Sequence, residues 1–365
     1  MKNTFGLNLS VTLFGESHGE QIGAVVDGLA PGLVVDQESI KRELARRRPS
    51  GETETARVEQ DDFKIISGVF EGKTTGSPLC IIIPNENTKS QDYKKTYGLA
   101  RPSHADYSAF CKYHGFEDYR GGGHFSGRIT APLVAVGAIL QDALKNIGIY
   151  IGTHILACGS QEDRAFNNVY EDIIELSKKS FPVLDSAIEQ NIITEITQAK
   201  NDQDSIGGKT QTAVFGLPAG VGEPWFDSIE SVISHAVFSI GGIKGVEFGL
   251  GFDFSTKRGS ECNDSFEVIN HKVYTKTNNN GGVNGGITNG MPIVFNCAVK
   301  PTPSISQPQQ TVDFINNVNE QITIKGRHDP AIIRRICPVL NSITAIAVSD
   351  LLITRFGTDF LSKGF

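Results

Sequence analysis

Three glycine- or proline-containing loops place histidines where they could do chemistry. The runs are GESHG (15–19), RPSHAD (101–106) and RGGGHFSGR (120–128). Glycine lets a backbone approach a ligand closely, and imidazole exchanges protons near neutral pH. A plain turn that only packs or caps its histidine is the alternative for each loop. GESHG does not match a G-x-S-x-G nucleophile elbow, because histidine and not serine is central.

Arginines near these loops predict an anionic ligand. Arg46, Arg47 and Arg48 end a predicted helix, where cations also offset the carbonyl end of the helix dipole. Three consecutive side chains cannot share one face, and the planar guanidinium fork suits carboxylate and phosphate. The three glycines of 120–128 lead into a long helix, which predicts a backbone-amide site for an anion with Ser126 and Arg128 as further donors.

Two later segments complete the set of polar turns. KPTPS (300–304) leaves a strand as a rigid turn, and GRHDP (326–330) precedes the last long helix. Asp329 followed by Pro330 also has the spacing of an N-cap with proline at N1, so a capping role alone is the alternative there. The sequence has no P-loop pattern and no dinucleotide-binding pattern. It also has no HExxH, EF-hand or Cys/His-cluster pattern, so metal catalysis is not expected.

Alternating and periodic apolar residues predict the elements that must position these loops. Strands are expected over 7–14 and 22–27, paired as a hairpin across the glycine-containing turn 15–19, and over 63–70, 79–84, 149–158, 211–217 and 291–299. A helix is expected from Asp36, as N-cap with Val35 and Ile40 spaced as a hydrophobic staple, to the arginines. Further helices are expected over 128–148, twice within 160–208, over 227–238 with an Asp227/Glu230 capping box, and over 330–356 with an interruption at Pro338. Adjacent strand pairs favour an α+β fold with antiparallel sheets over a doubly wound parallel sheet.

The bulk composition narrows the class of protein. The 365 residues carry a net charge of −7, which argues against non-specific nucleic-acid binding. No apolar run reaches the ~20 residues of a membrane span, and the amino terminus does not read as a signal peptide. Six scattered cysteines predict reduced, buried thiols in the cytoplasm. No linker is evident, so residues 1–365 are predicted to form a single domain.

Taken together and in order, these segments resemble the chorismate synthase family. The similarity covers nearly the whole chain and rests on these runs: GESHG, RRRP, SGVFEGKTTGSPL, RPSHADY, DYRGGGHFSGR, DSIGG, GLPAGVGEPWFD, SIGGIKGVEFG, GGVNGGITNG, KPTPSIS and KGRHDP.

The resemblance implies a lyase that forms chorismate from 5-enolpyruvylshikimate 3-phosphate by 1,4-elimination of phosphate and a ring proton. It implies a need for reduced FMN without net redox change, a single-domain β-α-β sandwich with largely antiparallel sheets, and a cytoplasmic homotetramer without nucleic-acid or membrane partners. NADPH is the implied source of reducing equivalents in members that reduce their own flavin. A flavin reductase or flavin-binding redox protein is the alternative from another class.

The resemblance also assigns roles by position. His18 matches the histidine that protonates the departing phosphate, His104 the one that serves the reduced flavin, and Asp329 the carboxylate that helps the flavin act as base. Substrate positions fall on Ser17, Arg47, Arg101, Ser126, Arg128 and Arg327. Flavin positions fall on His124, Phe125, Ser126, Gly241, Gly242, Gly285, Lys300, Pro301, Thr302, Pro303, Ser304 and Arg327, and NADP positions on Arg47 and Thr53.

Some positions depart from the family pattern. His124, Gly127 and Ile129 replace the usual Arg, Ala and Glu, so His124 is expected to hold flavin less firmly or only when protonated. The loop after Pro49 is short, and whether Arg57 replaces its missing arginine stays open. Gly241 and Gly242 stand where Asn-Ala is usual, which removes a side-chain amide.

Overall fold

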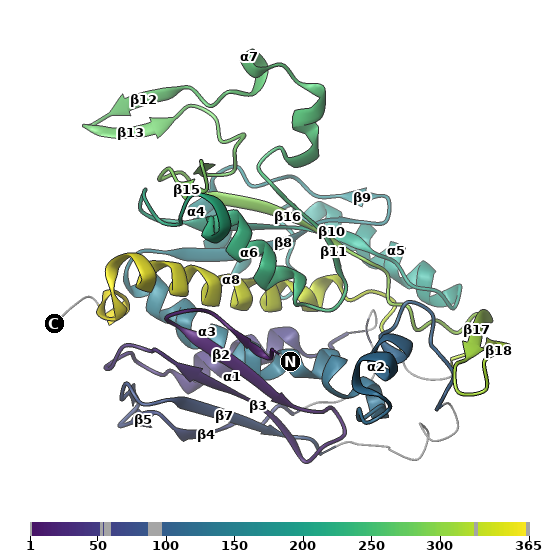
Figure 1. Cartoon of the computed structure of the whole chain (residues 1–365). Coiled ribbons are helices and arrows are strands. Elements are labelled where there is room, and N and C mark those ends of the chain that lie inside the picture. The colour runs from purple at the N-terminus through teal and green to yellow at the C-terminus, as the bar shows by residue number, and fades with distance from the viewer. Residues whose placement is uncertain (1, 52–53, 55–59, 87–96, 325–327, 363–365) are drawn as a thin grey trace.

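Two five-stranded sheets enclose a layer of helices (Figure 1). The computed structural model describes residues 2–51, 54, 60–86, 97–324 and 328–362. Within these ranges every strand pairing is antiparallel. The fold is therefore α+β with a β-α-β sandwich, as the sequence predicts.

The first sheet carries the His18 turn. Its order is β1-β2-β3-β7-β4, with bounds Thr4–Phe5, Ser10–Gly15, Gln21–Asp27, Leu79–Pro84 and Lys64–Ser67. Strand β7 alternates, so that Leu79, Ile81 and Ile83 are fully buried while the residues between them are partly exposed. The predicted hairpin of β2 and β3 is confirmed.

The second sheet is covered on both faces. Its order is β11-β16-β10-β8-β9, with bounds Ile243–Phe248, Ile293–Val299, Gly208–Phe215, Tyr150–Cys158 and Gln161–Glu162. Helix α8 (Ile333–Phe356) packs on β8 and β10, and α4 (Val169–Leu176) packs on the same two strands. Because both faces are covered, β8 is buried along most of its length and does not alternate.

The middle layer consists of α1 (Gln37–Arg47), α3 (Thr130–Asn146) and α8, with α6 (Ile229–Phe238) beside α8. A Cβ on Gly137 of α3 would lie 2.1 Å from Cβ of Ser342 in α8, so glycine allows the two helices to approach closely. Helix α8 is long and apolar enough to cross a membrane, but its apolar window is entirely buried inside the protein. It is the central core helix.

Helix α1 follows its predicted signals. The Asp36 side chain accepts a hydrogen bond of 2.9 Å from the Glu38 backbone, and Val35 and Ile40 are both buried, as a hydrophobic staple requires. The helix ends at Arg47, and the three arginine side chains then diverge. Arg46 reaches Glu43 on its own helix, whereas Arg47 and Arg48 turn to Asp61.

Two predictions about helix starts and one about a helix interruption were wrong. Helix α6 is capped by Ser228, whose hydroxyl accepts from Ser231, because Asp227 belongs to a preceding short 3-10 turn. Helix α8 begins at Ile333, so Asp329 and Pro330 precede it and do not form its cap. Pro338 does not interrupt α8. It lies in the second turn, where one missing N–H is offset by burial of the surrounding helix.

The remaining elements are short or peripheral. They are β5 (Val69–Phe70), β6 (Lys73–Thr74), α2 (Asp106–Tyr113), α5 (Ser186–Asn201), α7 (Gly259–Cys262), β12 (Phe266–Ile269), β13 (Lys272–Thr275), β14 (Val283–Asn284), β15 (Ile287–Thr288), β17 (Gln309–Asp313) and β18 (Val318–Ile322). The β12–β13 hairpin projects from the body of the molecule (Figure 1). All six cysteines are free and four are buried; the prediction of buried thiols is wrong for Cys111, which lies exposed on the short helix α2, and Cys80 is only partly buried.

Candidate active site

His18 lies on the turn between β2 and β3 and is held by its neighbour Ser17. The Ser17 hydroxyl is 3.1 Å from the Gly121 carbonyl and 3.1 Å from Nδ1 of His18. A carbonyl can only accept, so the hydroxyl donates to it and accepts from Nδ1–H of the ring. This contact orients the His18 imidazole and places a proton on Nδ1.

The three glycines of 121–123 make room for that histidine. All three have positive φ, and a Cβ on Gly121 would lie 2.2 Å from Cε1 of His18. The Gly123 carbonyl accepts a backbone hydrogen bond of 3.1 Å from Ser17. The run therefore packs the His18 turn, and Gly121 and Gly122 also line the cavity described below, so the anion-binding role expected of their amides stays a prediction.

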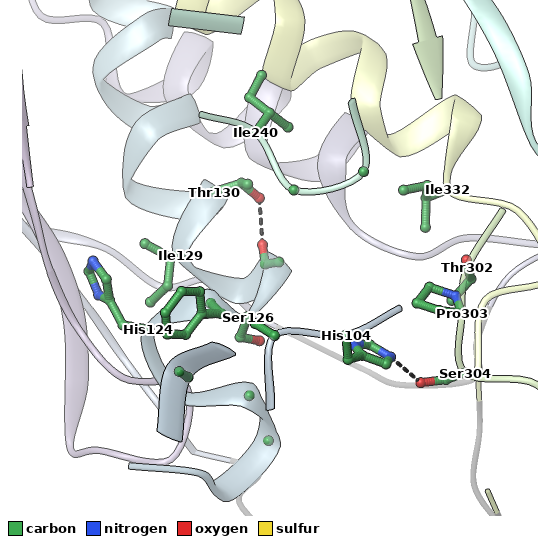
Figure 2. A pocket seen from close by; sticks show the side chains of 18 of the residues that line it. His104, His124, Ser126, Ile129, Thr130, Ile240, Thr302, Pro303, Ser304 and Ile332 are labelled. Carbon is green, nitrogen blue, oxygen red and sulfur yellow. Dashed lines mark hydrogen bonds between the residues drawn. The ribbon is translucent and has the colours of Figure 1, made fainter. Parts of the chain in front are cut away.

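His124, Phe125 and Ser126 connect the glycine run to α3. Nδ1 of His124 donates to the Gly15 carbonyl over 2.8 Å, while Phe125 is half exposed. The Ser126 side chain caps the short turn before α3 by accepting from the Arg128 backbone. Figure 2 shows His124 and Ser126 beside Ile129 and Thr130, where this segment leads into α3.

An arginine cluster, consisting of Arg47, Asp61 and Arg128, forms a buried charge network. The Asp61 side chain is fully buried, lies 3.1 Å from Nη2 of Arg47, and also makes a close ion pair with Arg128. Burial opposes ionisation of Asp61, but the charges of Arg47 and Arg128 and their hydrogen bonds outweigh it and lower the pKa of that carboxyl. Nε of Arg48 also lies 3.4 Å from this carboxylate, so three guanidinium groups around one carboxylate leave a net positive charge at this place.

A histidine cluster, consisting of His104, Ser304, His328 and Asp329, brings together residues distant in the sequence. Nε2 of His104 lies 2.6 Å from the Ser304 hydroxyl (Figure 2). Burial, with the nearby charge of Arg101 second, lowers the pKa of His104 to about 4. The ring is therefore neutral at pH 7.

His328 and Asp329 are the other titratable members of this cluster. Burial and the charge of Arg101 lower the pKa of His328, and its buried Nε2 has no partner among the described residues. The Asp329 carboxylate makes a close ion pair with Arg335. Nε of Arg335 donates to the Arg47 carbonyl over 3.0 Å, which links the histidine cluster to the arginine cluster.

The 300–304 turn is fixed against its surroundings by two further contacts. Nζ of Lys300 donates to the Ser103 carbonyl over 2.7 Å, and the Ser205 hydroxyl donates to the Thr302 carbonyl over 2.6 Å. The Thr302 hydroxyl is buried without a hydrogen-bond partner in the described part of the chain. A buried unpaired hydroxyl beside a cavity is suited to bind a polar ligand group.

These segments line one cavity of about 2100 Å³. The predicted site residues that line it are His18, Arg47, Arg101, His104, His124, Phe125, Ser126, Gly241, Gly242, Lys300, Pro301, Thr302, Pro303, Ser304 and Asp329. Most of the predicted site is thereby brought together from seven separate segments.

Some predicted positions lie elsewhere. Ser17 and Arg128 do not line the cavity but contact the residues that do, and Gly285 lies away from it on the β14–β15 turn. Arg327 and Thr53 lie outside the described residues, as does Arg57.

Sequence reasoning missed three lining cations or histidines and one buried anion. Lys244, His328 and Arg335 line the cavity, and Asp61 pairs its arginines. His328 could have been found, because it stands in the GRHDP run beside Asp329. Asp61 carries no local signal, since only folding brings it to Arg47.

Comparisons with known proteins agree along the length of the chain. The family model described as chorismate synthase matches residues 9–353. The chorismate synthase of Pyrococcus abyssi is 43% identical over 350 residues, covering 96% of this chain and 97% of that protein. The chorismate synthase of Methanobrevibacter smithii is 43% identical over 356 residues, covering 97% of each. A crystal structure of chorismate synthase superimposes with a TM-score of 0.76 at 28% identity, covering 98% of this chain and 95% of that one.

Proposed function

This chain belongs to the chorismate synthase family, and we propose that it converts 5-enolpyruvylshikimate 3-phosphate to chorismate and phosphate by 1,4-elimination. The family makes it an enzyme, a chorismate-forming lyase of the shikimate pathway. The single observation that carries the detailed proposal is the cavity in which His18, His104 and Asp329 converge with cations in an acidic protein.

The cations fit a substrate with one phosphate and two carboxylates. Arg47, Lys244, Lys300 and Arg335 line the cavity, so several positive charges face a ligand although the whole chain carries −7. In our proposal Arg47 and Arg101 bind the anionic groups, and Arg128 holds Arg47 in place through Asp61. Local positive charge in a closed site concentrates and orients such a ligand.

The residues also fit reduced FMN. The half-exposed Phe125 offers an aromatic face, the buried Thr302 hydroxyl needs a partner, and Lys300 offers charge for a phosphate. Gly241 adds open space, since a Cβ there would meet nothing within 4 Å. When bound, reduced FMN supplies the electron-rich ring that makes the elimination feasible without net oxidation.

The chain's own contribution is proton management and electrostatic preorganisation. His18, held by Ser17, protonates the departing phosphate when its ring is charged, and neutral His104 presents a donor to the flavin region. Asp329 receives a proton at its carboxylate while Arg335 keeps that carboxylate in place.

We extend the proposal to organisation and supply. Residues 1–365 form one domain and assemble as a cytoplasmic homotetramer, and the exposed side chains of Trp225, Phe226 and Phe252 are consistent with burial between copies. NADPH, contacting Arg47 and Thr53, serves as a source of reducing equivalents in this proposal.

The experiment compares two assays on the same purified protein. Chorismate formation is followed with chemically reduced FMN in one, and with NADPH plus oxidised FMN in the other. Product in the first assay supports the lyase. NADPH oxidation without chorismate in the second, together with no product in the first, would favour a flavin reductase instead.

A further inference from the structure

The contact between His104 and Ser304 joins two loops about two hundred positions apart in the chain. Their side chains meet at 2.6 Å between Nε2 and Oγ, and Ser304 is 6% exposed (Figure 2). The Lys300 contact to the Ser103 carbonyl fixes the same two loops beside it. Two adjacent contacts therefore hold these loops together, and the His104–Ser304 hydrogen bond is part of that fixed arrangement.

The hydrogen-bond inventory gives the direction of this contact. The Ser304 hydroxyl has no other hydrogen-bond partner among the described residues, so accepting from the ring would leave its own buried proton unpaired. Donation from Ser304 to Nε2 satisfies that proton and requires a lone pair on Nε2. A neutral imidazole with a lone pair on Nε2 carries its proton on Nδ1.

The charges around His104 fit that neutral ring. Burial, Arg101, Lys300 and His328 all oppose a positive charge on His104, and only Asp106 favours it. Asp106 is in turn held by a bidentate contact with Arg101, at 2.8 Å from Nε and 2.7 Å from Nη2. Nδ1 of His104 makes no hydrogen bond to any described residue, while the ring lines the cavity.

We propose that Ser304 is a positioning residue for His104: its hydroxyl donates to Nε2, fixes the ring and its tautomer, and leaves Nδ1–H as a hydrogen-bond donor for a ligand in the cavity. This inference rests on the proposed function for its activity assay only. It assigns Ser304 a role through His104, in addition to the flavin contact expected from the family.

The first test is a double-mutant cycle on turnover with reduced FMN. Ser304→Ala should lower kcat by roughly tenfold or more with a smaller change in KM, and Ser304→Thr should restore most of it because it keeps the hydroxyl. In a His104→Ala background, Ser304→Ala should change kcat by less than about twofold. An equal loss in both backgrounds would overturn the inference, because Ser304 would then act without His104.

The second test needs no substrate. Diethyl pyrocarbonate acylates an imidazole lone pair, and peptide mass analysis isolates the rate at His104. Ser304→Ala should raise that rate severalfold by freeing Nε2, Ser304→Thr should keep it low, and Ser306→Ala, a nearby serine outside the cavity lining, should leave it unchanged. An unchanged rate in Ser304→Ala would overturn the positioning role. A raised rate in a protein that forms no chorismate would sink the proposed function and leave this inference standing.

Discussion

The arginine cluster and the histidine cluster solve different problems in the same cavity. In the first, Arg47 and Arg128 share the fully buried carboxylate of Asp61. In the second, His104 and His328 lie near cations, and the pKa of each is lowered, chiefly by burial. The arginine cluster therefore holds paired, permanent charges that fix the shape and the electrostatic potential of the cavity wall. The histidine cluster keeps its imidazoles neutral, so they can form hydrogen bonds with a ligand.

The largest expected effects on turnover come from substitutions of the loop histidines. His18→Ala and His104→Ala should each lower turnover by ~10²–10⁴-fold, the range for a lost acid–base group. The melting temperature should change little, because neither ring belongs to the apolar core. Turnover is measured at saturating substrate and reduced FMN, and near-normal turnover in either variant would remove that residue from the mechanism.

The arginine cluster should respond in stability as well as in binding. Arg128→Ala leaves the buried Asp61 with fewer partners and should cost on the order of 3 kcal/mol of unfolding free energy, measured by denaturant titration. Arg47→Ala should in addition weaken substrate binding by about 1.5–3 kcal/mol, more than it weakens FMN binding. Arg46→Ala is the matched control, since Arg46 pairs with Glu43 outside the cluster. Equal loss of substrate and FMN affinity in Arg47→Ala would mean that Arg47 does not bind the substrate directly.

Asp329 shares a feature with each cluster: it belongs to the histidine cluster, but it makes an ion pair with a cation, as Asp61 does in the arginine cluster. Asp329→Asn should lower turnover by at least about tenfold, or ~1.4 kcal/mol in barrier, with FMN still bound. Arg335→Gln breaks the same ion pair while keeping the carboxylate, so it should cost less turnover. The same loss of kcat in both variants, with unshifted pH profiles, would reduce Asp329 to a partner for Arg335.

The smallest expected effect is on the pH dependence of stability. The pKa of His104 is about 4 in the folded protein, below the ordinary value of 6.5, so the unfolded chain binds more protons between these values. Stability contributed by neutral His104 is present above about pH 6.5 and is lost as pH falls toward 4. The loss should be on the order of 1 kcal/mol after discounting for partial exposure. Unfolding at pH 7 and pH 4 should therefore differ less in His104→Ala than in the unaltered protein, and equal pH dependence would contradict a depressed His104 pKa.

Local signals in the sequence predicted much of the fold. Alternation identified β2, β3 and β7, and the Asp36 cap with its staple identified α1, because such patterns are settled within a few residues. The prediction that Asp329 caps the last helix was wrong because of a tertiary contact. Its carboxylate pairs with Arg335, and the helix starts three residues after Pro330.

The site was predicted where motifs carry it and missed where folding creates it. His104 and Ser304 were each assigned by their own runs, but their mutual contact spans two loops and is invisible in either. The glycines of 121–123 predicted an anion-binding loop, but their packing against a histidine about a hundred residues earlier is visible only in the folded chain. Asp61 could not be found at all, because its partners come from the end of α1 and the short turn before α3.

The measurement that tests the central claim most directly is the ratio of chorismate formed to FMN oxidised, under anaerobic conditions with dithionite-reduced FMN. If the cavity runs an elimination that leaves the flavin reduced, chorismate accumulates far beyond the amount of flavin while the reduced-flavin spectrum persists. One flavin oxidised for each product formed would contradict the account and make the protein a redox enzyme.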